Sequence, residues 1–160
     1  NVSVTSIINL EKEQLNRKVV ATDATTVTVN GKLNYIRNFS TDNRVIYHAM
    51  NSKSIDALKE LDFLKCYSGT LLHDHETALY HFGTEHAECN VHMIRYLRKN
   101  TEETGNTWSE EMITHLCEMN RKRKELAEQG ICTFPVETIK EYEEKYFFLL
   151  EKGRTENKTT

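Results

Sequence analysis

The sequence predicts an α/β fold in which a mixed sheet is followed by a hairpin of two long helices. An Asn30-Gly31 pair separates two stretches of alternating polarity, and this pair is the strongest short hairpin signal because both turn residues need a positive φ. Strand and helix spacings alternate across residues 45–104, whereas residues 105–157 show helical spacing alone. An antiparallel hairpin followed by αβ units is typical of a mixed sheet covered by helices.

Three antiparallel strands are expected in the first part of the chain, because its β-branched residues suit a pleated surface. A short apolar run opens the first strand, and we expect its last residue, Asp23, to lie at a C-terminal strand end. The expected strands are residues 18–23 continued by 25–29, then 33–39, and then 45–50.

Short helices and strands are then predicted to alternate. Ser54 is a suitable N-cap for a helix over residues 55–64, because its hydroxyl can accept a backbone N–H. Gly83 is a typical residue to close a short helix over residues 76–82. The remaining expected elements are a buried strand over residues 69–74, a short strand over 85–89 and a helix over 91–100 capped by Asn90.

Two long helices are predicted for the last third of the chain. Thr107 and Glu110 have the spacing of a capping box, and the helix that they open is expected to stop at Gly130. Pro135 stands at the start of the second helix. We therefore expect a sheet domain over residues 1–104, a helical hairpin over residues 105–157 and a disordered tail over residues 158–160.

Composition excludes several classes of protein. The 160 residues carry a formal net charge of −3, which argues against a generic basic nucleic-acid binder. No apolar run approaches the ~18 residues of a membrane span, so no membrane partner is expected. The four cysteines are widely spaced, and we interpret them as reduced, mostly buried intracellular thiols, with a two-disulfide framework as the alternative.

Asp23 and Asp74 are the candidate catalytic residues. Each is the acid at the end of an apolar strand candidate in the same proposed sheet. Neighbouring strands lie ~4.8 Å apart, so two such carboxylates could share a hard cation such as Mg²⁺. Paired ions in such a site stabilise the attacking and leaving oxygens of a phosphodiester. The alternative is that both are surface acids at strand ends.

Two further groups of side chains could bind a ligand. A cluster of histidines near residues 73–92, with Cys89 and His92 three residues apart, offers the donors of a zinc site, although the spacing lacks two tight pairs. Two basic runs could grip phosphates, or could be solvated helix faces. These candidate DNA-binding residues are Arg95, Arg98, Lys99, Arg121, Lys122, Arg123 and Lys124.

At several segments the sequence resembles the insertion sequence sixty-six transposases. Val19–Leu33 resembles the family's first catalytic segment, and Leu71–His75 resembles the second, a strand that ends in Asp. His86–Arg98 resembles the family's Cys-x-x-His helix, and Trp108–Leu150 resembles the helical insertion that follows it. The resemblance covers residues 15–157 in the family's order and spacing.

This resemblance implies a ribonuclease H-like core with an Asp-Asp-Glu (DDE) site that holds Mg²⁺ or Mn²⁺ in a two-metal arrangement. Asp23 and Asp74 match its first two acids. The implied activity is cleavage and strand transfer of DNA by a bacterial, cytoplasmic transposase, with transposon ends and target DNA as partners and an oligomer expected for the full protein. Cys89 and His92 match a motif that we expect to be structural or to support the metal ligands, and zinc is not the expected cofactor.

The sequence departs from the family in two places. The third acid should be a Glu in an Asn-Asn-x-x-Glu-Arg-like segment, which does not occur here, and Glu125 and Glu143 are poor substitutes. We therefore expect a central fragment whose third acid lies beyond residue 160, with little nuclease activity of its own. Ala24 stands where the family commonly has a Glu that is not one of the three acids.

Two other classes of function stay open at this point. The chain could be a non-catalytic interaction module on a ribonuclease H-like scaffold, with the helical hairpin binding a partner. It could also be a zinc-stabilised structural domain, in which case zinc would be stoichiometric and would be lost when Cys89 is replaced.

Overall fold

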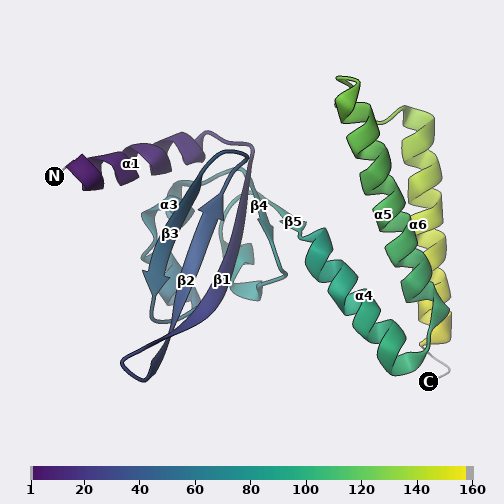
Figure 1. Cartoon of the computed structure of the whole chain (residues 1–160), viewed down its shortest axis with the longest axis horizontal. Coiled ribbons are helices and arrows are strands. Elements are labelled where there is room, and N and C mark those ends of the chain that lie inside the picture. Colours follow the sequence, from purple (N-terminus) through teal and green to yellow (C-terminus); the bar gives the residue numbers. More distant parts are fainter. Residues whose placement is uncertain (1, 158–160) are drawn as a thin grey trace. The chain divides into compact units, whose positions relative to one another are not determined.

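A computed structural model describes residues 2–157, which form two compact units (Figure 1). The first unit ends at Cys89 and the second begins at Asn90. The expected disordered tail over residues 158–160 lies outside the described residues.

The first unit is built on a five-stranded mixed sheet, as the sequence predicted. Strands β1 (Val19–Val29), β2 (Lys32–Ser40) and β3 (Val45–Met50) form an antiparallel meander. Strands β4 (Thr70–His73) and β5 (Glu85–Glu88) run parallel to β1 on its other side. The strand order is therefore β3-β2-β1-β4-β5, with β1 at the centre.

The hairpin between β1 and β2 forms where it was expected. Val29 pairs with Lys32 across a two-residue turn, and Asn30 and Gly31 have φ values of 51° and 73°. Both positions need the left-handed region, which Asn and Gly tolerate better than other residues.

Short helices and one longer helix accompany the sheet. Helix α1 (Val2–Leu15) was not predicted from the sequence, and its Gln14 Nε2 donates to the Phe39 carbonyl oxygen at 3.0 Å. The helix predicted over residues 76–82 is a 3₁₀ helix, η1 (Thr77–His81).

The single helix predicted over residues 55–64 is instead two short helices, α2 (Ile55–Lys59) and α3 (Asp62–Cys66). Ser54 caps α2 as expected, since its hydroxyl accepts from the Ala57 N–H. Leu61 between them is extended, with ψ 104°. This break lets both α2 and α3 turn their apolar side chains into the core. In one straight helix the same side chains would point in several directions around the axis.

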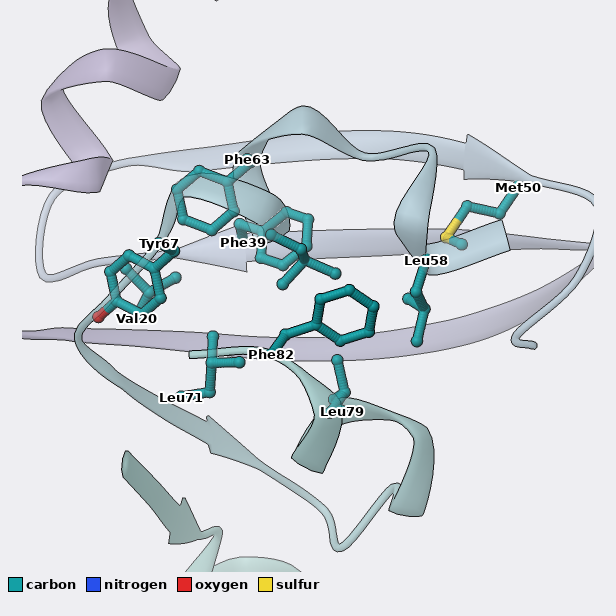
Figure 2. Close-up of a cluster of buried hydrophobic side chains, with 10 residues drawn as sticks. Val20, Phe39, Met50, Leu58, Phe63, Tyr67, Leu71, Leu79 and Phe82 are labelled. Carbon is teal, nitrogen blue, oxygen red and sulfur yellow. The ribbon is translucent and has the colours of Figure 1, made fainter. Parts of the chain in front are cut away.

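The core of this unit lies on one face of the sheet, under α2, α3 and η1 (Figure 2). Each fully buried apolar side chain stabilises the fold by about 1.5–3 kcal/mol. The cluster draws on β1, β2, β3 and β4 as well as the helices, so it fixes the strands against one another. Its members are Val20, Phe39, Met50, Leu58, Phe63, Leu64, Tyr67, Leu71, Leu79 and Phe82.

The second unit contains α4 (Asn90–Thr104), α5 (Thr107–Glu128) and α6 (Val136–Glu156). Its core joins Leu97 of α4 to Met112 of α5 and other apolar side chains. Because α4 packs on α5 in this way, it groups with the two long helices. The domain boundary expected after residue 104 stays a prediction.

The first turn of α5 is capped differently from the sequence prediction. Thr107 and Glu110 do not form a capping box, and the N-cap residue, Asn106, makes no side-chain cap. Instead the Glu156 carboxylate at the end of α6 accepts from the Thr107 N–H at 2.7 Å and from the Trp108 N–H at 3.2 Å. A carboxylate suits this position because helix N-termini carry free N–H groups and a partial positive charge.

The cysteines are free thiols, and the expectation that most are buried was wrong. Cys66, Cys117 and Cys132 are exposed, and Cys89 is half-buried. Among residues 2–157, no helix has the length and apolar character needed to cross a membrane.

Candidate functional site

The two predicted acids stand at matching positions after the pairing of β1 with β4. Their last parallel pair is Ala21 with Leu72, and Asp23 and Asp74 each stand two residues further on. Neighbouring strands are ~4.8 Å apart, so the two backbones lie within one strand spacing where the pairing ends. That Asp23 and Asp74 act together at a site stays a prediction.

Both acids belong to the face of the sheet opposite the core. Val20 and Thr22 precede Asp23 on β1 and are both buried. Leu71 and His73 of β4 precede Asp74 and are also buried. Side chains alternate between the two faces of a strand, so the acids project from the other face. Asp23 is accordingly exposed and Asp74 half-buried.

The expectation that Asp23 ends a strand was wrong, because β1 continues for six more residues to Val29. Thr25–Val29 is rich in β-branched residues and remains paired with β2 over its whole length. What ends near Asp23 is only the parallel pairing with β4. Asp74, in contrast, follows the last residue of β4 directly.

The two carboxylates have free oxygens suited to a cation. Asp74 Oδ1 is buried and has no hydrogen-bond partner among the described residues. Asp23 Oδ1 accepts from the Ala24 N–H at 2.7 Å, and the Asp23 N–H donates to Asn38 Oδ1 at 3.2 Å. A buried, unpartnered carboxylate oxygen is costly unless a cation or donor satisfies it. The pair therefore fits a divalent ion that prefers oxygen ligands.

These two acids do not make a complete metal centre by themselves. Within residues 2–157, no three His, Cys, Asp or Glu side chains come together in a group that could hold a metal ion. The predicted zinc alternative accordingly finds no ligand set in the part of the chain that the structure describes.

The histidines near Asp74 instead form hydrogen bonds with their neighbours. His73 is fully buried, and its Nε2 lies 3.1 Å from His86 Nδ1. Burial lowers the pKa of His73, and the neighbouring His86 lowers it further. His75 contacts Glu88, which also accepts from the Tyr80 hydroxyl at 2.9 Å.

The chain turns sharply directly after Asp74. His75 has a φ of 68°, a left-handed conformation that costs a residue with a side chain about 1–3 kcal/mol. Contacts on both sides hold this conformation: Glu88 binds the His75 ring, which lowers the pKa of Glu88, and Arg37 binds the next residue, Glu76. Asp74 therefore stands on a backbone that is fixed by its neighbours.

Sequence reasoning missed Arg37, the largest fully buried charged side chain in the described structure. It lies on the core face of β2, two residues before Phe39. A signal was present, because the alternation along β2 puts a cation at an apolar position, where it needs an acid as partner. The sequence does not indicate which acid that is.

Cys89 and His92 lie on opposite sides of the division between the two units. The Cys89 N–H extends the β4–β5 pairing by donating to the His73 carbonyl oxygen at 2.8 Å. His92 lies in the first turn of α4, and its Nδ1 is buried without a hydrogen-bond partner among the described residues. The role expected for these two residues stays a prediction.

The two basic runs differ in how far they are neutralised. On α4, Arg95 and Arg98 are exposed and form no ion pair among the described residues, while Lys99 lies 3.6 Å from Glu103. On α5, Glu125 lies 2.5 Å from Arg121 and 3.6 Å from Lys122.

The rest of the α5 run is also exposed. Arg123 donates to Asn120 at 3.1 Å, and Lys124 completes the run. Glu118 stands one helical turn before Lys122 and lies 3.5 Å from Lys145 of α6. The α4 run therefore presents the less compensated positive charge.

Comparison with models of protein families gives a match over most of the chain. No curated protein and no solved structure matches the chain. The model of the Transposase IS66 family matches residues 5–154, which is nearly the whole chain. A transposase acts on DNA, and this family implies a divalent metal ion. The chain belongs to the Transposase IS66 family.

Proposed function

We propose that Asp23 and Asp74 are the first two acids of a DDE metal site on a ribonuclease H-like sheet, which cleaves DNA and transfers its strands. The observation that supports this proposal is the parallel pairing of β1 and β4, which ends at Ala21 and Leu72, two residues before each acid. The antiparallel meander joined to parallel strands agrees with the sheet expected for a ribonuclease H-like core.

The chain's own residues would hold the metal in this mechanism. Asp74 offers a buried oxygen that lacks a partner, and Asp23 offers an exposed carboxylate of which one oxygen accepts a backbone N–H. Bound Mg²⁺ or Mn²⁺ would supply the positive charge that stabilises the attacking and leaving oxygens of an in-line displacement. Asp23 and Asp74 then serve to position that charge beside the scissile phosphodiester.

A third acid is needed to complete the site. The described residues place no third candidate ligand beside these two. We therefore expect a Glu outside these 160 residues to complete it, and we expect the chain alone to have little nuclease activity. Nicking of supercoiled plasmid tests this expectation. Robust turnover by the chain alone that is lost in Asp23→Asn would contradict it.

The basic face of α4 is the better candidate for contact with the DNA backbone. Arg95 and Arg98 are exposed and uncompensated within the described residues, so each can pair with a phosphate without breaking an existing ion pair. Arg121 on α5 would first have to leave Glu125. Arg–phosphate contacts release counterions, which makes DNA affinity fall as the salt concentration rises.

Paramagnetic NMR with Mn²⁺ tests the metal site in the chain as it is. A bound Mn²⁺ broadens nearby amide signals, so the strongest loss is expected around Asp23 and Asp74. Asp23→Asn and Asp74→Asn should each abolish this pattern. Asp42→Asn, which removes an exposed carboxylate from the β2–β3 turn, should preserve it.

The opposite outcome is equally informative. If Mn²⁺ broadens no signals near Asp23 and Asp74 in the folded parent, the metal-site proposal is wrong. A chain that folds normally but binds no metal there would favour the non-catalytic interaction module.

A further inference from the structure

A single buried guanidinium connects the segments that carry both acids. Arg37 on β2 has no exposed surface. Its Nη1 donates to Thr22 Oγ1 at 3.1 Å, and its Nη2 donates to the two Glu76 carboxylate oxygens at 2.6 and 2.8 Å. Thr22 directly precedes Asp23, and Glu76 follows Asp74 by two residues.

The contact with Glu76 anchors the loop after β4 from the core side of the sheet. Glu76 is 13% exposed, and its second cation, Lys53, lies 3.5 Å away in the segment before α2. Loops usually have fewer buried contacts than this. Here the residue two positions after Asp74 is fixed by an ion pair in which Arg37 Nη2 donates to both carboxylate oxygens of Glu76.

We infer that Arg37 is a positioning residue, which sets the Asp74 carboxylate beside Asp23 by holding Thr22 and Glu76 through one guanidinium. This inference rests on the function proposed for the two acids. Arg37 and Thr22 project to the core face and the acids to the opposite face, so Arg37 acts through the backbone. Residues that support metal ligands typically change metal affinity by 10–100-fold when they are replaced.

The fork of Arg37 is essential to this role, because Lys has one compact ammonium and cannot bind Thr22 and both Glu76 oxygens in the same planar geometry. A purely structural role would require only a compensated buried charge. Arg37→Lys therefore separates the two roles better than Arg37→Ala, which leaves Glu76 without its main partner and endangers folding.

The first measurement does not depend on metal. Amide hydrogen exchange and ¹⁵N relaxation in the parent and in Arg37→Lys report the order of residues 74–76. We expect faster exchange and greater mobility there in the variant, with α3 and β3 unchanged. Phe63→Leu, a core substitution that removes no hydrogen-bond partner of Arg37 or Glu76, is the control for general loss of stability.

The second measurement is the Mn²⁺ dissociation constant from the same NMR titration. Arg37→Lys should weaken binding at least tenfold, whereas Phe63→Leu should leave it within about twofold. The double variant Arg37→Met/Glu76→Leu replaces the pair with apolar side chains, an exchange that often preserves stability. It should fold and should still bind Mn²⁺ more weakly than the parent.

The outcomes separate this inference from the proposed function. A parent that binds no Mn²⁺ at Asp23 and Asp74 refutes the proposed function, and the order of residues 74–76 in Arg37→Lys then decides whether Arg37 anchors the loop. If the parent binds Mn²⁺ and a folded Arg37→Lys binds it equally well, the positioning role is overturned. An unchanged loop in that variant overturns it as well.

Discussion

Replacing Asp23 by Asn should stabilise the metal-free protein and abolish its stabilisation by metal. The proposed site sets the two acids side by side, just beyond the last pair of β1 and β4, so their negative charges would repel each other when no cation is present. Asn keeps the Oδ1 that accepts from the Ala24 N–H at 2.7 Å, so the substitution removes the charge while preserving that contact. A functional site is expected to cost stability in this way.

The size of the repulsion follows from the strand spacing. Two unit charges ~4.8 Å apart interact by roughly 0.9 kcal/mol at the dielectric constant of water and by roughly 3.5 kcal/mol at an effective value near 20. Asp23 is exposed, so the lower figure applies and salt screens it further. We expect Asp23→Asn to gain up to about 1 kcal/mol at low salt and less at 0.5 M salt, a concentration at which the Debye length is only ~4 Å.

Metal should reverse the order of stability. A ligand at about ten times its dissociation constant stabilises the folded state by about 1.4 kcal/mol. For a domain of the size of the first unit this corresponds to a rise in Tm of roughly 6–11 °C. The parent should show this rise with Mn²⁺, and Asp23→Asn should not.

Thermal unfolding followed by circular dichroism, with and without Mn²⁺, measures both effects. Asp42→Asn is the matched control, since it removes an exposed acid from the β2–β3 turn and should leave the response to Mn²⁺ intact. An Asp23→Asn protein that gains as much Tm from Mn²⁺ as the parent would refute the reasoning.

Three further outcomes are expected. Hydrogen bonds from Thr107 and from the Trp108 N–H lower the pKa of Glu156. The Glu156 carboxylate therefore contributes its full stabilisation when the pH is above the ordinary pKa of Glu, and this contribution is lost as the pH falls through the lowered pKa. Glu156→Gln should flatten the acid side of the Tm–pH curve of the second unit. Gly153→Ala should destabilise that unit, because the added Cβ would lie 2.7 Å from the Trp108 ring. Overpacking costs about 1–3 kcal/mol, and a contact this short belongs to the upper part of that range, which outweighs the ~1 kcal/mol gain in helix propensity. A higher Tm would contradict this. Arg95→Gln with Arg98→Gln should weaken DNA binding at every sequence and reduce the slope of log affinity against log salt by about 2, as measured by fluorescence anisotropy.

Local signals in the sequence predicted most of the sheet. The Asn30-Gly31 turn determines the β1–β2 register through a conformation that few other residues adopt, so its position could be read without knowing the rest of the fold. The break between α2 and α3 could not be read in this way. The break allows Leu58 of α2 and Phe63 of α3 both to point into the core. The position of that core is set by strands that are distant in the sequence.

Long-range polar contacts were the least predictable part of the structure. Glu156 lies 49 residues from Thr107, and Glu76 lies 39 residues from Arg37. Sequence spacing identifies partners only within a helix turn or across a known hairpin, because only there is the separation fixed by local geometry. The capping box was therefore predicted for Thr107 although a carboxylate from the far end of α6 occupies that place.

Side chains alternate between the two faces of the sheet, so one face supplies the core and the other is available for the proposed chemistry. Val20 and Leu71 bury their side chains in the core, while Asp23 on β1 and Asp74, directly after β4, belong by alternation to the other face. Packing on the core face can therefore fix the backbone that carries the acids without using their carboxylates as packing groups. Arg37 is a buried charged residue on the core face, and its contacts with Thr22 and Glu76 place it where a change in the core would reach the segments that carry both acids.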